Sequence, residues 1–488
     1  MIHLDRRTLL KLLAAASARS LVGCAPAESI GEAGSRLGGG KTVVVLGGGL
    51  AGLCSAYELR KRGYNVVAIL EAQYRPGGRV NTYRGFANNQ YAELGATRIP
   101  DTHNYTLGYA AQFNLPLRQF LDGPSLYYVR GQRFVHNDGD AWPSVFSFKP
   151  SELTQGADSI IFNYENLAEL GNPLAADWPT GTALSFNGMG YPQYLQAKGA
   201  EDDVILLNRA INGTEITRDG ALFWLMTDVL DAAWNNTYAI AGGNDQLPYA
   251  FAGTLGNLVK YGSIVTGIHQ DPGGVTVTYA GISGGGWEGG QTVSAELCVC
   301  AIPYSVLRAI PITPAVSAEK AYSIQNMAMM PVSRCYMQTQ SRFWNQQGIG
   351  GLKVARTDTS IERLWDHTAV QDGPSGILQS YMMASNAEAF AALPSSQRVS
   401  SVENQVSAFF PEIKQQVTQT HVKIWQQDPW ARGGWAYHPP GQTAALFPAA
   451  KRSEGRIHFC GEHTSPWGGW MQGALESANR VVNEIVNG

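Results

Sequence analysis

The chain has 488 residues, with 36 Lys and Arg against 39 Asp and Glu, and a formal net charge of −3. At about 150 residues per domain, this length leaves room for about three domains. A hydrophobic content of 44% supplies a large core and excludes global disorder. The near-neutral charge argues against nucleic acid as a partner, because surfaces that bind nucleic acid are strongly basic.

The cysteines are scattered along the chain. They are Cys24, Cys54, Cys298, Cys300, Cys335 and Cys460. No CxxC pair is present, and no group of Cys and His has the spacing of a zinc site. We expect the five cysteines of the folded body to be small buried hydrophobic side chains. The sequence predicts neither a disulfide framework nor a metal site.

The N-terminus has the pattern of a targeting segment. Residues 5–11 (DRRTLLK) precede an apolar, Ala-rich stretch over residues 12–22, which is typical of a twin-arginine export signal for a periplasmic or secreted protein. Residues 21–24 (LVGC) also resemble a lipobox, which would place a lipid on Cys24. An inert tail would instead leave the protein cytoplasmic. Residues 25–40 form a Gly/Ser/Ala-rich linker, and no stretch reaches ~18 uninterrupted apolar residues, so no membrane span is expected.

A dinucleotide-binding unit is predicted from residue 42 onward. Residues 42–46 are a β-branched apolar run, followed by Gly47-Gly48-Gly49-Leu50-Ala51-Gly52 and a helical stretch over 50–62. A second apolar strand over 66–70 ends at Glu71. Strand, GxGxxG, helix, strand and acid within about 30 residues make up the dinucleotide fingerprint.

Each position of this unit has a physical role. Gly47 allows the tight turn, Gly49 lets backbone N–H groups reach a pyrophosphate, and Gly52 lets the helix pack on the strand. The helix N-terminus favours phosphate charge, and Glu71 is placed to accept hydrogen bonds from a ribose diol. A Gly-rich turn that binds nothing is the alternative. The predicted cofactor site also includes Leu50, Ala51 and Ala72.

A second glycine loop, Arg75-Pro76-Gly77-Gly78-Arg79, follows directly after the acid. Ordinary nicotinamide dehydrogenases have no such loop, so it indicates a cofactor that reaches further than its adenosine half. We expect Gly78 in the cofactor site and the Arg79 guanidinium on the pyrophosphate. A simple type II turn is the alternative.

The C-terminus supplies the other end of the cofactor site. A short strand over 456–460 leads into Gly461-Glu462-His463-Thr464, and Trp467-Gly468-Gly469-Trp470 follows. The apolar residues from about 471 to 486 recur in steps of three and four, which predicts a helix with one face on the sheet. Its N-terminus would lie beside the Gly-Gly-Trp turn and stabilise negative charge on a reduced flavin ring.

Together these three segments resemble the flavin amine oxidase family, and most of all its bacterial L-amino acid oxidases. The resemblance covers nearly the whole chain from residue 41. It implies an α/β (α+β) fold, in which a Rossmann-like FAD-binding domain of the p-hydroxybenzoate hydroxylase/amine oxidase type is interleaved with a substrate domain and a helical lid. Further segments follow one another along the chain as they do in this family: residues 242–248, 263–265 and 301–303. The resemblance implies that the backbone of Val265 contacts the adenine.

The resemblance also implies substrate contacts. Residues 93–100 (ELGATRIP) look like the L-amino acid oxidase version, which places Gly95, Ala96 and Thr97 at the cofactor and Arg98 on the substrate carboxylate. The residues agree in kind, because a guanidinium in a weakly charged loop with only Glu93 as a local acid suits bidentate carboxylate capture. An Arg98 that is paired internally is the alternative.

Aromatic residues complete the site that the resemblance implies. Tyr381 would also bind the carboxylate, or else be a core aromatic residue. Trp470 would form a wall beside the flavin and Trp435 a second wall, so that two ring faces confine the amine group; a core position is the alternative for Trp435. Residues assigned to the cofactor here are Gly461, Glu462, Gly469 and Trp470, and those assigned to the substrate are Arg98, Tyr381, Met383, Trp435, Gly469 and Trp470.

Three departures from the family pattern matter. Trp435 stands where mammalian monoamine oxidases carry a flavin-linked Cys, so we expect non-covalent FAD. Arg334 stands where the family usually has a lysine that holds a water at flavin N5, so we expect Arg334 at the reacting centre with its role left open. None of the nine histidines falls in residues 140–268, so the histidine of snake-venom relatives has no counterpart. No catalytic base is assigned, since positioning carries the rate.

The predicted domains are interleaved. The FAD-binding domain takes residues 41–100, 240–315 and 430–488, and the substrate domain takes 101–145 and 316–429. Residues 146–239, with a helical pattern over 221–234, form the lid. Residues 283–290 (SGGGWEGG) are expected to be a hairpin loop.

The leading hypothesis is an L-amino acid oxidase that converts an L-amino acid and O₂ to a 2-oxo acid, ammonia and H₂O₂. An amine oxidase for substrates without a carboxylate, a tryptophan monooxygenase and a flavin-binding protein without turnover are the alternatives. The aromatic segments, with Trp467, Met382 and Met383, predict a preference for large apolar side chains, because the sequence locates no acid or base for a charged one, although the lid could supply it. The resemblance leaves a homodimer open.

Overall fold

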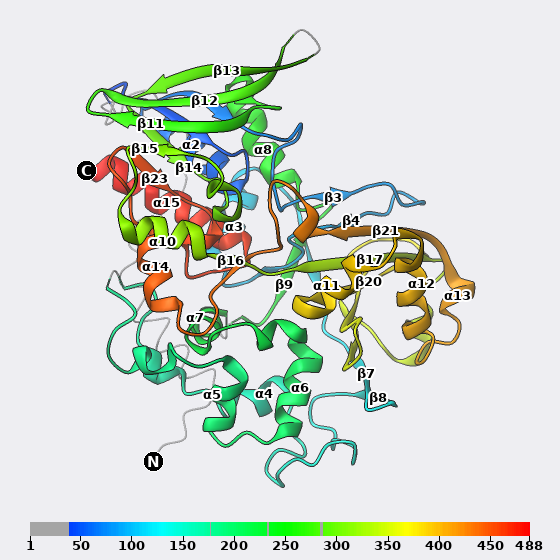
Figure 1. Ribbon diagram of the computed structural model, residues 1–488. Helices are drawn as coiled ribbons and strands as arrows, with labels where there is room; N and C mark the ends of the chain where they lie inside the picture. Colours follow the sequence, from blue (N-terminus) through cyan, green and yellow to red (C-terminus); the bar gives the residue numbers. More distant parts are fainter. Residues whose placement is uncertain (1–38, 176, 232–233, 284–285) are drawn as a thin grey trace.

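The computed structural model describes residues 39–175, 177–231, 234–283 and 286–488 (Figure 1). The predicted export signal, the lipobox with Cys24 and almost all of the linker lie outside the described residues and stay predictions. Among the described residues, every helix is too short or too polar to span a lipid bilayer.

A five-stranded parallel sheet carries the dinucleotide unit. Its strand order is β10-β2-β1-β14-β23, and every pairing in it is parallel. The strands are β1 (Thr42–Leu46), β2 (Asn65–Leu70), β10 (Val259–Lys260), β14 (Leu297–Cys300) and β23 (Ile457–Phe459). The predicted strands over 42–46, 66–70 and 456–460 are thereby confirmed.

The central strands of this sheet are buried on both faces, as continuous apolar runs in a parallel sheet require. On one face, Val43 and Val45 belong to a core with α2 (Leu50–Lys61) and α15 (Met471–Asn487), which pack against each other. Both helices were predicted; α2 ends before Gly63, whose φ of +81° lies in the left-handed region that glycine adopts freely at a helix C-terminus.

The other face of the parallel sheet is covered by a four-stranded sheet, at the top of Figure 1. Its order is β13-β12-β11-β15, with β11 (Ile264–Asp271), β12 (Gly274–Ser283), β13 (Gly286–Ala295) and β15 (Ile312–Thr313). The hairpin at 283–290 is confirmed, but its loop is shorter than expected, since β13 already begins at Gly286. Cys298 and Cys300 belong to this buried core, as expected for small hydrophobic side chains.

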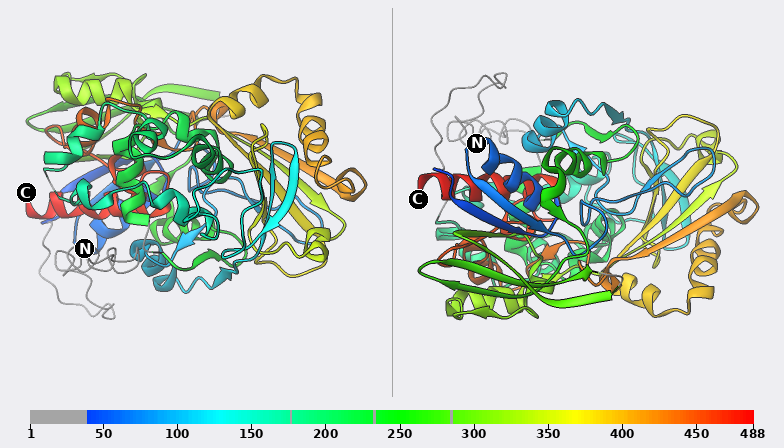
Figure 2. Two further views of the ribbon diagram at one scale, coloured as in Figure 1. Left: turned by 90° about the horizontal axis from the view of Figure 1, so that it is seen from below. Right: turned by 90° about the horizontal axis from the view of Figure 1, so that it is seen from above.

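A seven-stranded sheet forms the second body. Figures 1 and 2 show that it lies at one end of the molecule and the parallel sheet at the other. Its order is β21-β17-β20-β19-β18-β7-β8. One face packs on α11 (Ala384–Ala392), α12 (Ser395–Val406) and α13 (Ile413–Gln416). The strands are β7 (Ser125–Val129), β8 (Gln132–His136), β17 (Val332–Thr339), β18 (Lys353–Thr357), β19 (Arg363–Asp366), β20 (Gly376–Met383) and β21 (Val417–Ile424).

The other face of the seven-stranded sheet shares a core with a helical segment, which lies at the bottom of Figure 1. This segment, residues 157–231, is the helical part of the predicted lid over 146–239, and from here on we call it the lid. The predicted helix over 221–234 is present as α7, which ends at Asp231. The lid consists of α4 (Ala157–Phe162), η1 (Leu167–Leu170), η2 (Gly181–Phe186), α5 (Tyr191–Ala197), α6 (Asp202–Asn212), η3 (Gly213–Thr217) and α7 (Ala221–Asp231).

Short elements connect these bodies. The strands are β3 (Thr82–Tyr83), β4 (Ala92–Glu93), β5 (Ile99–Pro100), β6 (Leu117–Phe120), β9 (Thr237–Ile240), β16 (Ala328–Met329) and β22 (Ala436–Tyr437). The helices are α3 (Asn104–Gln112), α8 (Gln246–Leu255), η4 (Gly256–Leu258), α9 (Tyr304–Leu307), α10 (Ala318–Asn326), η5 (Phe343–Gln347), η6 (Trp425–Gln427), α14 (Thr443–Lys451) and η7 (Glu462–Thr464). The exact domain boundaries stay a prediction.

Candidate functional site

A cavity of about 850 Å³ runs between the parallel-sheet body, the seven-stranded sheet and the lid. Its wall begins at the glycine loop after β1 and ends at the inner face of the seven-stranded sheet and the lid. Nearly all of the predicted cofactor residues line it: Gly47, Gly49, Leu50, Ala51, Glu71, Ala72, Gly78, Arg79, Gly95, Ala96, Thr97, Arg98, Val265, Gly461, Glu462, Gly469 and Trp470.

The glycine loop at one end of the cavity has the geometry of a dinucleotide cradle. Gly47 adopts a φ of +98°, and a Cβ on Gly49 would meet nothing within 4 Å, so this backbone is open to a ligand. Gly52 does not line the cavity. A Cβ there would lie 2.0 Å from the Gly47 carbonyl oxygen, so Gly52 serves the close packing that the fingerprint predicts.

Glu71 is fixed at the edge of this cradle. Its two carboxylate oxygens accept hydrogen bonds from the backbone N–H groups of Gly48, at 2.6 Å, and Gln73, at 2.7 Å. Burial raises the pKa of Glu71, and these two hydrogen bonds oppose the rise. Because the carboxylate retains further lone pairs on the cavity wall, it can accept hydrogen bonds from a ribose diol.

Arg79 and Glu462 join the chain segments around the middle of the cavity. Arg79 pairs with Glu462 at 2.5 Å and donates to the Gly434 carbonyl oxygen at 3.2 Å. Glu462 also accepts from the backbone N–H groups of Ala436, at 3.1 Å, and Gly469, at 2.9 Å. The Arg79–pyrophosphate contact stays a prediction; the structure shows that Arg79 also holds the wall together.

Arg98 lies among three tryptophan rings on the cavity wall. Its guanidinium carbon is 4.8 Å from the ring centroid of Trp365 and 5.4 Å from those of Trp234 and Trp470. Cation–π attraction holds the guanidinium in this setting. The nearby acid, Glu93, is buried and accepts from the Asn244 N–H and the Thr82 hydroxyl, each at 2.8 Å.

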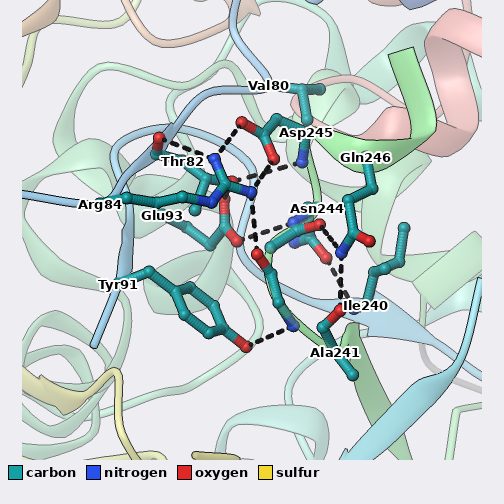
Figure 3. Close-up of polar contacts among 12 residues, drawn as sticks. Val80, Thr82, Arg84, Tyr91, Glu93, Ile240, Ala241, Asn244, Asp245 and Gln246 are labelled. Atoms are coloured by element: carbon teal, nitrogen blue, oxygen red, sulfur yellow. Dashed lines mark hydrogen bonds and ion pairs between the residues drawn. The ribbon is translucent and has the colours of Figure 1, made fainter. Parts of the chain in front are cut away.

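The loop that carries Arg98 is fixed by the segment before α8. Figure 3 shows the polar contacts of this segment, including those of Asn244 with Glu93 and of Asp245 with Arg84. Asn244 donates to the carbonyl oxygens of Ala96 and Thr97 at 3.1 and 3.0 Å. Asp245 forms a two-pronged ion pair with Arg84, at 2.6 and 2.7 Å. Burial raises the pKa of Glu93 to about 8, and the hydrogen bonds from Asn244 and Thr82 oppose the rise. These contacts preset the position of Arg98.

Tyr381 lines the cavity from β20 and lies against two guanidinium groups. The Arg334 and Arg363 guanidinium carbons are 4.2 and 4.9 Å from its ring centroid. Arg334 also donates to the carbonyl oxygens of Glu93, at 3.2 Å, and Gly95, at 2.6 Å. The structure therefore gives Arg334 a positioning role behind Tyr381 and the Arg98 loop, as well as a place on the cavity wall.

Trp435 and Trp470 both line the cavity, as expected for two aromatic walls. Gly469, with a φ of +80°, brings its backbone against Trp435, since an added Cβ would lie 3.3 Å from the ring. Met383 does not line the cavity, contrary to its assignment as a substrate contact. It is fully buried, and its sulfur lies 3.1 Å from an Arg363 nitrogen, so it supports that arginine from behind. Met382 and Trp467 are also absent from the wall.

Several wall residues were not predicted. Arg363 and Trp365 come from β19, where their alternate positions place them on one face of the sheet. Their alternation with Leu364 and Asp366 is the one local signal in this short strand, and it does not mark a binding site. The lid adds acids, including Glu215 and Asp219, that no sequence pattern marks. The lid thus supplies the charged groups that the sequence left unlocated.

The described part of the cavity wall contains neither a cysteine nor a cluster of metal-ligand side chains. Cys54, Cys298, Cys300, Cys335 and Cys460 are all buried in the protein core, and none lines the cavity. The described residues contain no group of three or more His, Cys, Asp and Glu side chains placed to hold a metal ion.

Comparisons with known proteins agree with this geometry. The chain is 27% identical over 464 residues to an L-amino-acid oxidase of Demansia vestigiata (91% of this chain, 86% of the relative). It is 28% identical over 479 residues to a flavin-dependent L-tryptophan oxidase of Lentzea aerocolonigenes (92% and 99%).

Solved structures share the fold. Putrescine oxidase bound to putrescine has a TM-score of 0.80 at 20% identity, and cyclohexylamine oxidase from Brevibacterium oxydans has 0.78 at 22%. Each alignment covers 92% of this chain and 99% of the other. The family model for flavin containing amine oxidoreductases matches residues 50–486. The chain therefore belongs to the flavin-containing amine oxidoreductase family and has its α/β fold.

Proposed function

We propose that the protein is an FAD-dependent L-amino acid oxidase. The net reaction converts an L-amino acid, O₂ and water to a 2-oxo acid, ammonia and H₂O₂. The observation that supports this substrate class best is Arg98, whose guanidinium lies on the cavity wall among Trp234, Trp365 and Trp470. A planar cation held among aromatic rings suits a carboxylate.

FAD fits the residues that line the cavity. The open backbone at Gly49, the fixed carboxylate of Glu71 and the far wall at Gly469 would hold its pyrophosphate, ribose and ring ends. When bound, FAD would supply the two-electron oxidant that O₂ regenerates.

The protein side chains would orient the substrate. Arg98 and Tyr381 would bind the carboxylate, while Trp435 and Trp470 would confine the amine group between ring faces and exclude water. With the carboxylate and the amine group fixed, only one enantiomer directs its Cα–H toward the cofactor. The protein is therefore expected to oxidise L-amino acids and not their D-enantiomers.

The flavin is expected to bind without a covalent link. By the resemblance, Trp435 stands where mammalian monoamine oxidases carry a flavin-linked cysteine, and no described cysteine lines the cavity. Denaturing the yellow protein with acid or heat and filtering it should therefore release intact FAD into the filtrate. Flavin absorbance that stays with the precipitated protein would contradict non-covalent binding.

A peroxide assay with matched substrates tests the proposed function. H₂O₂ should form with an L-amino acid but not with the amine left after its decarboxylation, because the amine lacks the group that Arg98 binds. A preference for the amine would instead indicate an amine oxidase, and an amide product would indicate a monooxygenase. Bound flavin without turnover on any of these compounds would leave a flavin-binding protein.

A further inference from the structure

Five acids of the lid line the cavity, and they differ in their surroundings. They are Asp158, Glu165, Glu215, Asp219 and Asp228. Glu165 accepts a hydrogen bond from the Tyr191 hydroxyl, and the charge of Asp158 acts on Lys353 and Arg356. Asp219 is different. Its side chain is 2% exposed, and its Oδ1 has no hydrogen-bond partner among the described residues.

The backbone on both sides of Asp219 is held by hydrogen bonds, which fix the point from which its side chain extends. Asp219 lies between η3 and α7, and its carbonyl oxygen accepts from the Tyr191 N–H at 3.1 Å. The Gly220 N–H donates to the His438 carbonyl oxygen at 2.9 Å. A Cβ on Gly220 would lie 3.0 Å from the carbonyl oxygens of His438 and Pro439, so this contact requires glycine.

Other buried acids of this part of the chain are satisfied by protein groups. Glu152, 3% exposed, accepts from the Tyr164 hydroxyl and the Lys149 N–H. Asp203, 8% exposed, pairs with Arg130 at 2.5 Å and accepts from the Ser147 N–H. A buried carboxyl group with an oxygen left unbonded is costly. Among the described residues, Glu362, Glu476 and Glu484 also have a buried oxygen without a hydrogen-bond partner, but they do not line the cavity, whereas Asp219 does. Its place on the cavity wall lets a ligand group serve as the partner of Asp219.

The charged neighbour of Asp219 is an acid. Burial, and then the charge of Glu215, raise the pKa of Asp219 well above its usual value. Glu215 itself lies 3.8 Å from Arg363, which gives it a cationic partner. A cation in the cavity would relieve both the burial and the repulsion at Asp219 by pairing with its carboxylate.

Charged groups of both signs line the cavity. Arg98 and Arg363 lie with Tyr381 and Trp365 on the side of the seven-stranded sheet, and Asp219 lies on the lid. A molecule with a carboxylate at one end and a cation at the other matches this arrangement. The sequence predicted a preference for apolar substrate side chains because it located no acid that could bind a charged one. Asp219 is such an acid, so the reason for that preference no longer holds.

We propose that Asp219 forms a subsite for a cationic side chain, so that the preferred substrates are L-amino acids carrying a distal ammonium or guanidinium. This inference rests on the proposed oxidation of L-amino acids and specifies their side chain. In this proposal Asp219 binds the cation of the substrate's side chain and does not contact the α-amino group.

Kinetics of Asp219→Asn with paired substrates test the subsite. L-Lysine and L-norleucine differ in the distal ammonium alone. Removing one partner of a desolvated charge pair should lower kcat/KM for L-lysine by about 30-fold, while kcat/KM for L-norleucine stays within about twofold. Glu152→Gln is the matched control, since it neutralises a buried acid outside the cavity and should leave the ratio of the two substrates unchanged. An equal loss on both substrates, as a role toward the α-amino group requires, would overturn the proposal.

A binding measurement on the wild-type holoenzyme does not depend on any variant. 6-Aminohexanoate spans the same distance as lysine from carboxylate to ammonium but lacks the α-amino group, and hexanoate lacks both amines. We expect 6-aminohexanoate to raise Tm more than hexanoate and to inhibit L-amino acid oxidation more strongly. Equal effects of the two compounds would overturn the subsite.

The proposed function can fail separately in the same experiment. H₂O₂ formed from 6-aminohexanoate, with none from any L-amino acid, would show oxidation at a distal amine. Oxidation at Cα would then be excluded, while the tighter binding of 6-aminohexanoate over hexanoate would still support the cation subsite.

Discussion

Arg98→Ala is expected to lower kcat/KM for L-amino acids by about 30-fold or more, because truncating one partner of a desolvated charge pair costs ~2–5 kcal/mol. Arg98→Lys should recover only part of this loss. A lysine restores the charge but cannot form two parallel hydrogen bonds to a carboxylate, and its compact ammonium is a poorer fit among three indole rings. Steady-state kinetics with one preferred L-amino acid would measure both effects.

Two controls make the Arg98 result specific. Any slow oxidation of the corresponding decarboxylated amine should be unaffected in Arg98→Ala, since that substrate presents no carboxylate. Arg118→Ala removes a guanidinium whose ion pair with Asp372 is exposed, and it should leave kcat/KM unchanged. Near-normal kcat/KM of Arg98→Ala with L-amino acids would mean that the carboxylate binds elsewhere in the cavity.

Glu462→Ala is expected to cost about 1–3 kcal/mol of stability and to abolish retention of FAD, because it leaves the partly buried Arg79 without its charged partner. The substitution also removes the acceptor for the backbone N–H groups of Ala436 and Gly469. The segments of the cavity wall that contain Arg79, Ala436 and Gly469 would all lose their contact with Glu462. Thermal unfolding and the ratio of flavin to protein absorbance after gel filtration would report the two losses.

The matched control for Glu462 is an exposed ion pair. Glu319 lies 3.4 Å from Arg452, and both side chains are at least half exposed. Glu319→Ala should change stability by only about 0–1 kcal/mol and leave flavin retention unaffected. If Glu462→Ala behaved like Glu319→Ala, the Arg79–Glu462 pair would not be needed to assemble the site.

The elements nearest the cofactor could be predicted because their signals are local. The turn at Gly47, the packing of Gly52 and the fixed acid Glu71 follow from one short stretch of sequence, and the structure shows each in its expected place. The helix over 471–486 likewise carries its own apolar periodicity. In each case a backbone requirement selects a particular residue type.

The substrate end depends instead on long-range packing. Trp365, Trp234 and Trp470 meet at Arg98 from three separate parts of the chain, and no periodic pattern records that meeting. Met383, which the resemblance assigned to the substrate, lies two residues after Tyr381 on β20. The side chain of Arg363 occupies the intervening space, which leaves the methionine behind the wall.

The parallel sheet has a consequence for the order of events during synthesis. Its central strand β1 is among the first elements made, but its outer strand β23 and the helix α15, which packs on α2, come from the C-terminal end. At about 5–20 residues per second, the nascent glycine loop waits on the order of a minute for these partners. We therefore expect flavin binding to follow the synthesis of α15, and truncation within α15 should yield colourless protein even with the entire glycine loop intact.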